Sequence, residues 1–189
     1  MEKDFKKYRW FFTSNGNLVI GGKSSEQNEE IMKNINSGDI IFHTASPGSP
    51  FCIIKKPGKS DIEETAVFNA CFSQEWKRGR KKSEVHIFSG KQVVKNKGMK
   101  EGTFGIIGAV KKKNVELKLT LCFQEKFLRA VPLKTAEKEM MLILIPGKIG
   151  KEEASKKILS LLKERFDVIV SKEDILNAIP SGGFDIKEN

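Results

Sequence analysis

The sequence is poor in the residues that most often carry catalysis or metal binding. It contains two histidines, His43 and His86, and three widely separated cysteines, Cys52, Cys71 and Cys122. None of these residues has the short spacing of a zinc site, and no carboxylate pairing marks a magnesium site. We therefore expect neither a metal nor another cofactor. An odd number of scattered cysteines favours reduced, buried thiols in an intracellular compartment.

Long apolar runs and recognisable targeting signals are also lacking. No apolar run approaches the roughly 20 residues that a membrane span requires, and the first residues do not resemble a signal peptide. The glycines between Gly16 and Gly22 and between Gly102 and Gly108 match no nucleotide-binding fingerprint, and there is no P-loop or internal repeat. We expect a soluble, cytoplasmic protein without a membrane partner.

Acidic residues are scarce in one long stretch of the chain. Residues 76–113 contain twelve Lys or Arg but only two acidic residues, Glu84 and Glu101, within a chain of 189 residues and net charge +10. Clustered cations neutralise phosphates and release counterions, so nucleic acid is the expected partner. The alternative is a solvated charged face that only keeps the protein in solution.

The hydrophobic pattern predicts an α+β fold, with a mainly antiparallel sheet and flanking helices. Asn15-Gly16 predicts a turn between strands 8–13 and 18–22. Helices are expected at 24–35, 61–74, 151–166 and 171–179, with Ser25 as a cap of the first. Further strands are expected at 39–43, 51–54, 85–88, 92–94, 102–108, 115–123, 140–145 and 168–170, the one at 140–145 being stopped by Pro146-Gly147.

This order of elements suggests two parts. Residues 1–131 are expected to form the main domain. Residues 132–189 form a strand–helix–strand–helix extension, which can also share the core of the main domain. The function of this extension is not indicated by any motif.

A stiff turn follows the strand that ends at His43. Pro47 and Pro50 restrict the backbone angles of this turn. Gly48 permits a positive φ and lets another group come close to the backbone. Backbone N–H groups and the hydroxyls of Ser46 and Ser49 on such a turn suit an anion or a nucleic-acid backbone. For His43 itself three roles remain open: fixing its own turn, contacting phosphate or sugar, and acting in catalysis.

The strongest chemical signal is the basic segment that starts at Trp76. Trp76 is an aromatic residue that can stack on a base or pack inside the protein. The cations expected to contact phosphate, with Lys95 and Lys97 converging on the first cluster, are Lys77, Arg78, Arg80, Lys81, Lys82, Lys95 and Lys97.

Several short motifs follow one another in a distinctive order: WFFTSNGNLVIGGK at 10–23, QNE at 27–29, GDIIFH at 38–43, PGSP at 47–50, ACFSQEW at 70–76, VVK at 93–95 and GTFGIIG at 102–108. In this order they resemble the NFACT-R domain of ribosome-associated quality-control factors. The resemblance covers roughly residues 5–115. The NFACT-N domain and the coiled coil of the large factors have no counterpart here, which speaks against C-terminal tailing by this chain alone.

The resemblance implies an RNA-contacting module. It carries over to positions that match the family motifs: Trp10, Lys23, Gln27, Asn28, Glu29, His43, Pro47, Gly48, Ser49, Ser73, Trp76 and Lys95.

From the sequence we expect a non-enzymatic protein that binds tRNA or ribosomal RNA in translation or ribosome-associated quality control. Ribosomal or quality-control proteins are further possible partners. The alternatives are a DNA-binding or sensing module, a nuclease or RNA-modifying enzyme that uses His43, and a protein-docking adaptor.

Overall fold

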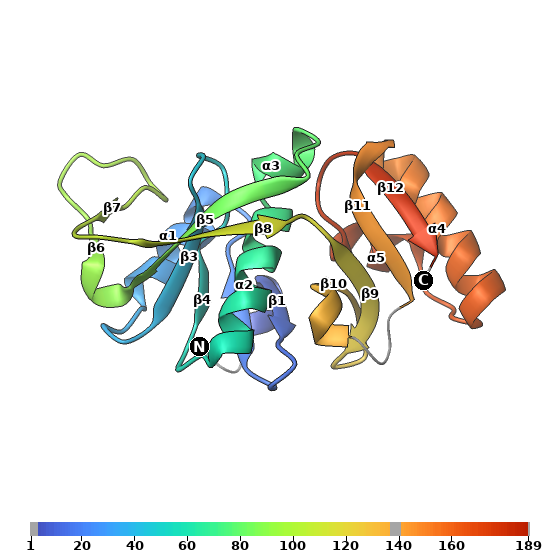
Figure 1. The fold of residues 1–189 in the computed structure, drawn as a ribbon, viewed down its shortest axis with the longest axis horizontal. Coiled ribbons are helices and arrows are strands. Elements are labelled where there is room, and N and C mark those ends of the chain that lie inside the picture. The colour runs from blue at the N-terminus through green and yellow to red at the C-terminus, as the bar shows by residue number, and fades with distance from the viewer. Residues whose placement is uncertain (1–3, 137–140, 189) are drawn as a thin grey trace.

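The structure is a computed structural model that describes residues 4–136 and 141–188. Two antiparallel sheets lie side by side, each with helices packed against it (Figure 1). The six-stranded sheet has the order β1-β2-β4-β3-β5-β8. Its strands are β1 (Arg9–Phe12), β2 (Leu18–Gly21), β3 (Ile40–Thr44), β4 (Cys52–Ile54), β5 (Lys82–Ser89) and β8 (Lys111–Glu116).

The second sheet has four strands in the order β10-β9-β11-β12. They are β9 (Leu119–Gln124), β10 (Phe127–Val131), β11 (Leu142–Ile149) and β12 (Phe184–Glu188). A small ribbon of β6 (Val93–Val94) and β7 (Gly105–Ile106) lies at the far end of the large sheet (Figure 1). Among the described strands every pairing is antiparallel, so the predicted α+β class is confirmed.

Helices cover the two faces of the large sheet unequally. The helices are α1 (Ser25–Lys33), α2 (Lys59–Cys71), α3 (Gln74–Lys77), α4 (Lys151–Phe166) and α5 (Lys172–Ala178), with short 3-10 turns at Phe5–Lys7, Gly90–Gln92 and Leu133–Ala136. One face packs on α2 through Phe42, Val85 and Ile87, in a cluster that continues into the second sheet. The other face carries Ile41 and Phe88, which share a smaller cluster with Ile31 of α1.

Most expected elements are confirmed. The hairpin of β1 and β2, the strands β3 and β4, and the helices α1, α2, α4 and α5 all lie where the pattern predicts them. Asp61 explains why the first turn is well defined, because its carboxylate accepts hydrogen bonds from Thr13 Oγ1, Asn15 Nδ2 and Asn17 Nδ2 at 2.6–3.0 Å, and from Gly58 N at 2.7 Å. The cap of α1 is Ser24, whose hydroxyl accepts from Gln27 N, and not Ser25.

Four further predicted details of the fold are wrong. The alternating run 115–123 is not one strand: it breaks at Leu117-Lys118, so β8 belongs to the large sheet and β9 to the second sheet. Leu117 is buried and its N–H donates to Lys81 O, which holds this corner between the sheets. The alternation of apolar and polar residues does not reveal this corner, because β8 and β9 continue the same two-residue period through it.

The other three errors concern the C-terminal part. β11 does not stop at Pro146-Gly147 but continues to Ile149 through a register shift, which is a position that tolerates proline. Residues 168–170 are an extended connection and not a strand. The tail after Pro180 forms β12, so the order is strand–helix–helix–strand. Met140, the expected start of β11, lies outside the described residues.

The expected division near residue 131 falls inside the second sheet. β9 and β10 precede this position and pair with each other, and β9 also pairs with β11, which follows it. One hydrophobic cluster includes residues of α2, the second sheet and α4. No described helix is long and apolar enough to cross a membrane.

Candidate nucleic-acid interface

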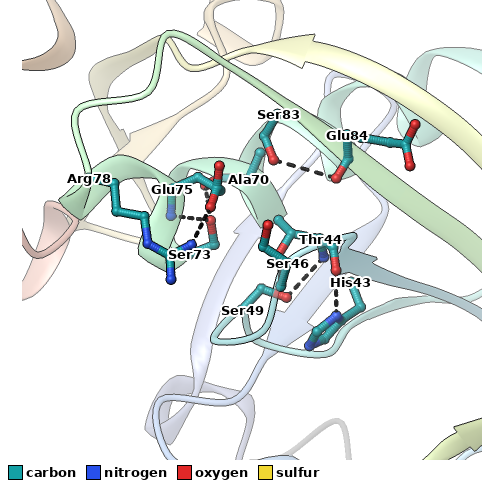
Figure 2. Close-up of polar contacts among 10 residues, drawn as sticks. All are labelled: His43, Thr44, Ser46, Ser49, Ala70, Ser73, Glu75, Arg78, Ser83 and Glu84. Atoms are coloured by element: carbon teal, nitrogen blue, oxygen red, sulfur yellow. Dashed lines mark hydrogen bonds and ion pairs between the residues drawn. The ribbon is translucent and has the colours of Figure 1, made fainter.

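The turn after β3 is held by its own side chains and by α3 (Figure 2). Thr44 N donates to Ser49 Oγ at 3.0 Å, and Thr44 Oγ1 donates to Ser46 O at 2.7 Å. Gln74 N donates to Gly48 O at 2.9 Å, which fixes the turn against the first residue of α3. Gly48 has φ +92°, and a Cβ there would lie 2.4 Å from Gln74 Cγ. Glycine is therefore required both by conformation and by space.

The two serines of the turn have different environments. Ser49 is buried, and its hydroxyl donates to Pro50 O. Its single donor is used inside the turn, so the expectation that both hydroxyls face a ligand is wrong for Ser49. Ser46 is half-buried and lines the surface beside the basic segment.

His43 fixes the turn and also faces a hollow. Its Nδ1 lies 2.7 Å from Thr44 O, and its ring lies 4.6 Å from the ring of Phe51. A carbonyl oxygen only accepts, so Nδ1 carries the proton. Burial lowers the pKa of His43 by more than the hydrogen bond to Thr44 O raises it. The imidazole is therefore neutral near pH 7, with Nε2 as an acceptor that has no hydrogen-bond partner among the described residues.

The hollow beside His43 has a volume of about 510 Å³. It lies between the turn and the 101–106 segment, and α1 contributes Ser25 and Asn28 to its wall. Phe51 and Phe104 form an apolar floor, with their rings packed edge to face at 5.5 Å.

The QNE motif of α1 organises the walls of this hollow. Gln27 Oε1 accepts from Lys23 N at 3.0 Å, and Asn28 Oδ1 accepts from Phe51 N at 3.1 Å. Glu29 Oε2 accepts from Lys95 Nζ at 2.8 Å and from Gly102 N at 2.9 Å. The three side chains thus tie α1 to three separate segments.

On the other side of the turn lies a basic hollow of about 340 Å³. Arg78, Arg80 and Lys82 line it together with Ser46, and Ala45 borders both hollows. Arg78 Nη1 is paired with Glu75 Oε1 at 2.7 Å (Figure 2). Arg80 and Lys82, in contrast, have no ion pair among the described residues. The turn therefore stands between a surface with three cations, which Glu75 and Glu84 also line, and an aromatic surface that includes Glu101 but no Lys or Arg.

Cross-strand pairing adds residues that the sequence did not single out. His43, His86 and Lys112 are register partners across β3, β5 and β8, so their side chains form a row on one face of the sheet. Glu84 lies 3.0 Å from His86 Nε2 and 3.3 Å from Lys112 Nζ. The alternation within KSEVHIF at 82–88 already assigns Lys82, Glu84 and His86 to one face, but only the register brings them beside His43.

Several predicted contact residues are placed otherwise. Trp10 and Trp76 are 2% and 0% exposed, so neither ring can stack on a base in this structure. Trp76 Nε1 donates to Gly183 O at 3.0 Å, and the ring packs on Phe184, so its role is to join α3 to β12. The predicted stacking of Trp76 on a base is wrong. Its partner Gly183 lies 107 residues away in the sequence, so the local pattern around Trp76 does not indicate this contact.

The lysines that were predicted to contact phosphate also lie in different environments. Lys81 Nζ donates to Pro146 O and lies 3.9 Å from Asp185, so it connects the two sheets. Lys95 is held by Glu29, Lys100 O and Thr103 O at 2.8–3.0 Å, beyond the hollow that His43 faces. It therefore does not converge with the first cluster as expected. Lys77 and Lys97 are exposed and line neither hollow.

No group of three or more metal-ligating side chains occurs in the described parts of the chain. Within the same residues no carboxylate is hydrogen-bonded to His43, whose Nδ1 is occupied by a backbone carbonyl.

Comparison with known proteins shows the family to which the chain belongs. Residues 7–108 match the family described as NFACT protein RNA binding domain. The chain is 32% identical to the archaeal Rqc2 homolog aRqcH of Methanocaldococcus jannaschii over 97% of its own length and 29% of the relative. It is 36% identical to the ribosome quality control complex subunit NEMF of Homo sapiens over 38% of this chain and 7% of that one. The chain thus spans less than a third of the length of these relatives.

A solved structure shares the fold. The C-terminal part of the fibronectin/fibrinogen-binding protein from Streptococcus suis aligns with a TM-score of 0.50 and 21% identity, over 58% of this chain and 44% of that one.

Proposed function

Because the chain belongs to the NFACT RNA-binding domain family, we propose that it binds RNA through the surface on both sides of the 44–49 turn. We further propose that the RNA is tRNA or ribosomal RNA, and that binding serves ribosome quality control without catalysis. The relatives named for ribosome quality control support this context.

One observation carries the RNA-binding proposal: a rigid turn with exposed Pro47 and Gly48 stands between a basic hollow and an aromatic one. Arg80 and Lys82 form no ion pair among the described residues, although Glu75 and Glu84 line the same hollow, and can neutralise phosphates. Phe104 is half-buried in the other hollow and offers an apolar surface to an unpaired base.

The protonation of His43 favours RNA over DNA. A neutral imidazole with Nδ1–H engaged presents only an acceptor at Nε2, and phosphate oxygens are acceptors too. The donor that distinguishes an RNA backbone is the ribose 2′-hydroxyl. We assign Nε2 of His43 to accept a hydrogen bond from such a hydroxyl.

The basic hollow is tested by the salt dependence of tRNA binding. The variant R80A/K82A removes two unpaired cations, and we expect the slope of log K against log salt to become shallower by about 1 for each lost phosphate contact. Fluorescence anisotropy with a labelled tRNA transcript at several salt concentrations measures this. The control K157A/K163A removes two exposed cations of α4 and should keep the wild-type slope. An unchanged slope in R80A/K82A would contradict binding at this surface.

The role of His43 is tested with an RNA and a DNA strand of the same sequence. His43→Phe retains a ring beside Phe51 but removes the Nε2 acceptor together with the Nδ1–H bond to Thr44 O, so we expect the ratio of RNA affinity to DNA affinity to decrease. His86→Phe, on the adjacent strand and outside the aromatic hollow, is the control. Equal binding of both polymers by the wild type would favour the DNA-binding alternative, and cleavage or modification of the RNA would favour the enzymatic one.

A further inference from the structure

The face of the large sheet that α1 covers changes from apolar to polar along β3 and β5. Ile41 and Phe88 are register partners and pack in one cluster with Ile31 of α1. Two residues further along the same face lie His43 and His86, which are also register partners. The apolar cover therefore ends at this pair, and the face continues as a polar surface over β5 and β8.

One carboxylate organises this polar surface. Glu84 Oε1 lies 3.0 Å from His86 Nε2 and 3.3 Å from Nζ of Lys112, the register partner of His86 on β8. The side chains of His86, Glu84 and Lys112 are 26%, 33% and 60% exposed, so a ligand on this face can reach all three. We call Glu84 and Lys112, with the strands that carry them, the β5–β8 surface.

The β5–β8 surface adjoins both hollows of the proposed RNA interface. Ala45 N donates to Glu84 O at 2.9 Å, so Glu84 lies directly beside the turn (Figure 2). Glu84 and its register partner Asn114 line the basic hollow. His43, which lines the aromatic hollow, is the register partner of His86. An RNA strand bound at the turn can therefore continue over β5 and β8.

Glu84 is one of only two acidic residues between positions 76 and 113. The hydrogen bonds from His86 and Lys112 lower the pKa of Glu84, so the carboxylate is ionised at neutral pH. Carboxylate and phosphate oxygens are equivalent acceptors for a lysine ammonium group. In the free protein Glu84 thus occupies the place at Lys112 that a phosphate oxygen would take.

We propose that the RNA backbone crosses the β5–β8 surface and that one of its phosphates replaces Glu84 as the partner of Lys112. Glu84 is then an internal competitor that limits RNA affinity. This assignment rests on the RNA binding proposed above and adds a contact on β8. Phosphate is common to RNA and DNA, so the exchange does not change the preference for RNA that is assigned to His43.

The residue next to Lys112 offers a matched control. Successive residues of a strand point to opposite faces of the sheet, so Lys113 faces α2. Its Nζ lies 3.4 Å from Glu63 Oε1, and Glu63 Oε2 lies 3.6 Å from Lys134 Nζ. Glu63 is 39% exposed, close to the value for Glu84. The two glutamates therefore hold neighbouring lysines of β8 on opposite faces, with similar access to solvent.

The test compares Glu84→Gln with Glu63→Gln, which have the same net charge. Gln keeps an oxygen that can accept from His86 but loses the charge that holds Lys112. We expect E84Q to bind a labelled tRNA transcript about two- to fivefold more tightly than E63Q, the range that one exposed ion pair covers. K112Q should bind more weakly than K113Q by a similar factor. Fluorescence anisotropy at one fixed salt concentration measures the affinities, and melting curves verify that each variant folds.

The double variant E84Q/K112Q shows whether Glu84 acts through Lys112. The exchange predicts that Glu84→Gln tightens tRNA binding in the wild type but much less in the K112Q background. An equal gain in both backgrounds would mean that Glu84 only repels RNA from a distance, and the assigned exchange at Lys112 would be wrong.

Parallel measurement of R80A/K82A separates this inference from the function on which it rests. If E84Q matches E63Q and K112Q matches K113Q while R80A/K82A has a shallower salt slope, the exchange is wrong and the proposed RNA interface stands. If R80A/K82A keeps the wild-type slope while E84Q and K112Q differ from their controls, the β5–β8 surface stands and the role of the basic hollow is wrong. Failure of the wild type to bind tRNA at low salt would overturn both.

Discussion

At the scale of single residues, Asp61 shows how one carboxylate fixes a turn that belongs to the candidate family motif. Each carboxylate oxygen receives two hydrogen bonds, from Thr13 and Asn15 on one side and from Asn17 and Gly58 on the other. Burial by itself would raise the pKa of Asp61, but these donors more than offset it and hold the pKa below its usual value.

We expect Asp61→Asn to destabilise the protein by ~2 kcal/mol. The Asn side chain places an NH2 group where a carboxylate oxygen now accepts, so two of the four donors lose their hydrogen bonds. The lowered pKa means that this stabilisation is complete above the ordinary Asp value of 3.8 and is lost as pH falls through the folded value. Urea unfolding of the two proteins should therefore differ at pH 7 and converge in strong acid. Asp167→Asn, at an exposed left-handed position, is the control. A constant difference at every pH would contradict this account.

At the scale of elements, the turn after β3 depends on α3 and not only on its own prolines. Gly48 and Gly98 have nearly equal φ values, +92° and +91°, but only the Cβ of residue 48 would meet another side chain. We expect Gly48→Ala and Gly98→Ala each to lose ~1 kcal/mol of stability. Only Gly48→Ala should also weaken tRNA binding, since the turn must move away from Gln74. Thermal melting measures the loss of stability, and fluorescence anisotropy measures tRNA binding. Equal tRNA affinities of the two variants would show that the position of the turn does not matter for binding.

At the scale of the whole molecule, side chains from each sheet satisfy backbone groups of the other. Gln124 both donates to Phe12 O and accepts from Phe12 N, so it closes the free edge of β1. Arg129 donates two hydrogen bonds to Trp10 O on the same edge. Such cover prevents an exposed edge strand from pairing with another chain.

These contacts and the shared hydrophobic cluster lead us to expect one cooperative unfolding transition for the chain. Tryptophan fluorescence and far-UV circular dichroism should give coincident urea curves. Trp76→Phe removes the hydrogen bond to Gly183 O and should shift both curves equally to lower urea. Two separate transitions would instead support independent folding of the parts before and after residue 131.

What the sequence determined by itself was local. The period of apolar residues and the Asn15-Gly16 turn specify elements whose contacts lie within a few residues, as does Ser171, the N-cap of α5, whose hydroxyl accepts from Asp174 N. The order of the motifs indicated the family. The tertiary structure decided what depends on distant partners. It buried Trp76 against β12, turned Lys81 toward Pro146, and split the alternating run at Leu117 between two sheets. It also placed Arg129 against Trp10, 119 residues away, because only strand pairing and sheet packing can bring such positions to one place.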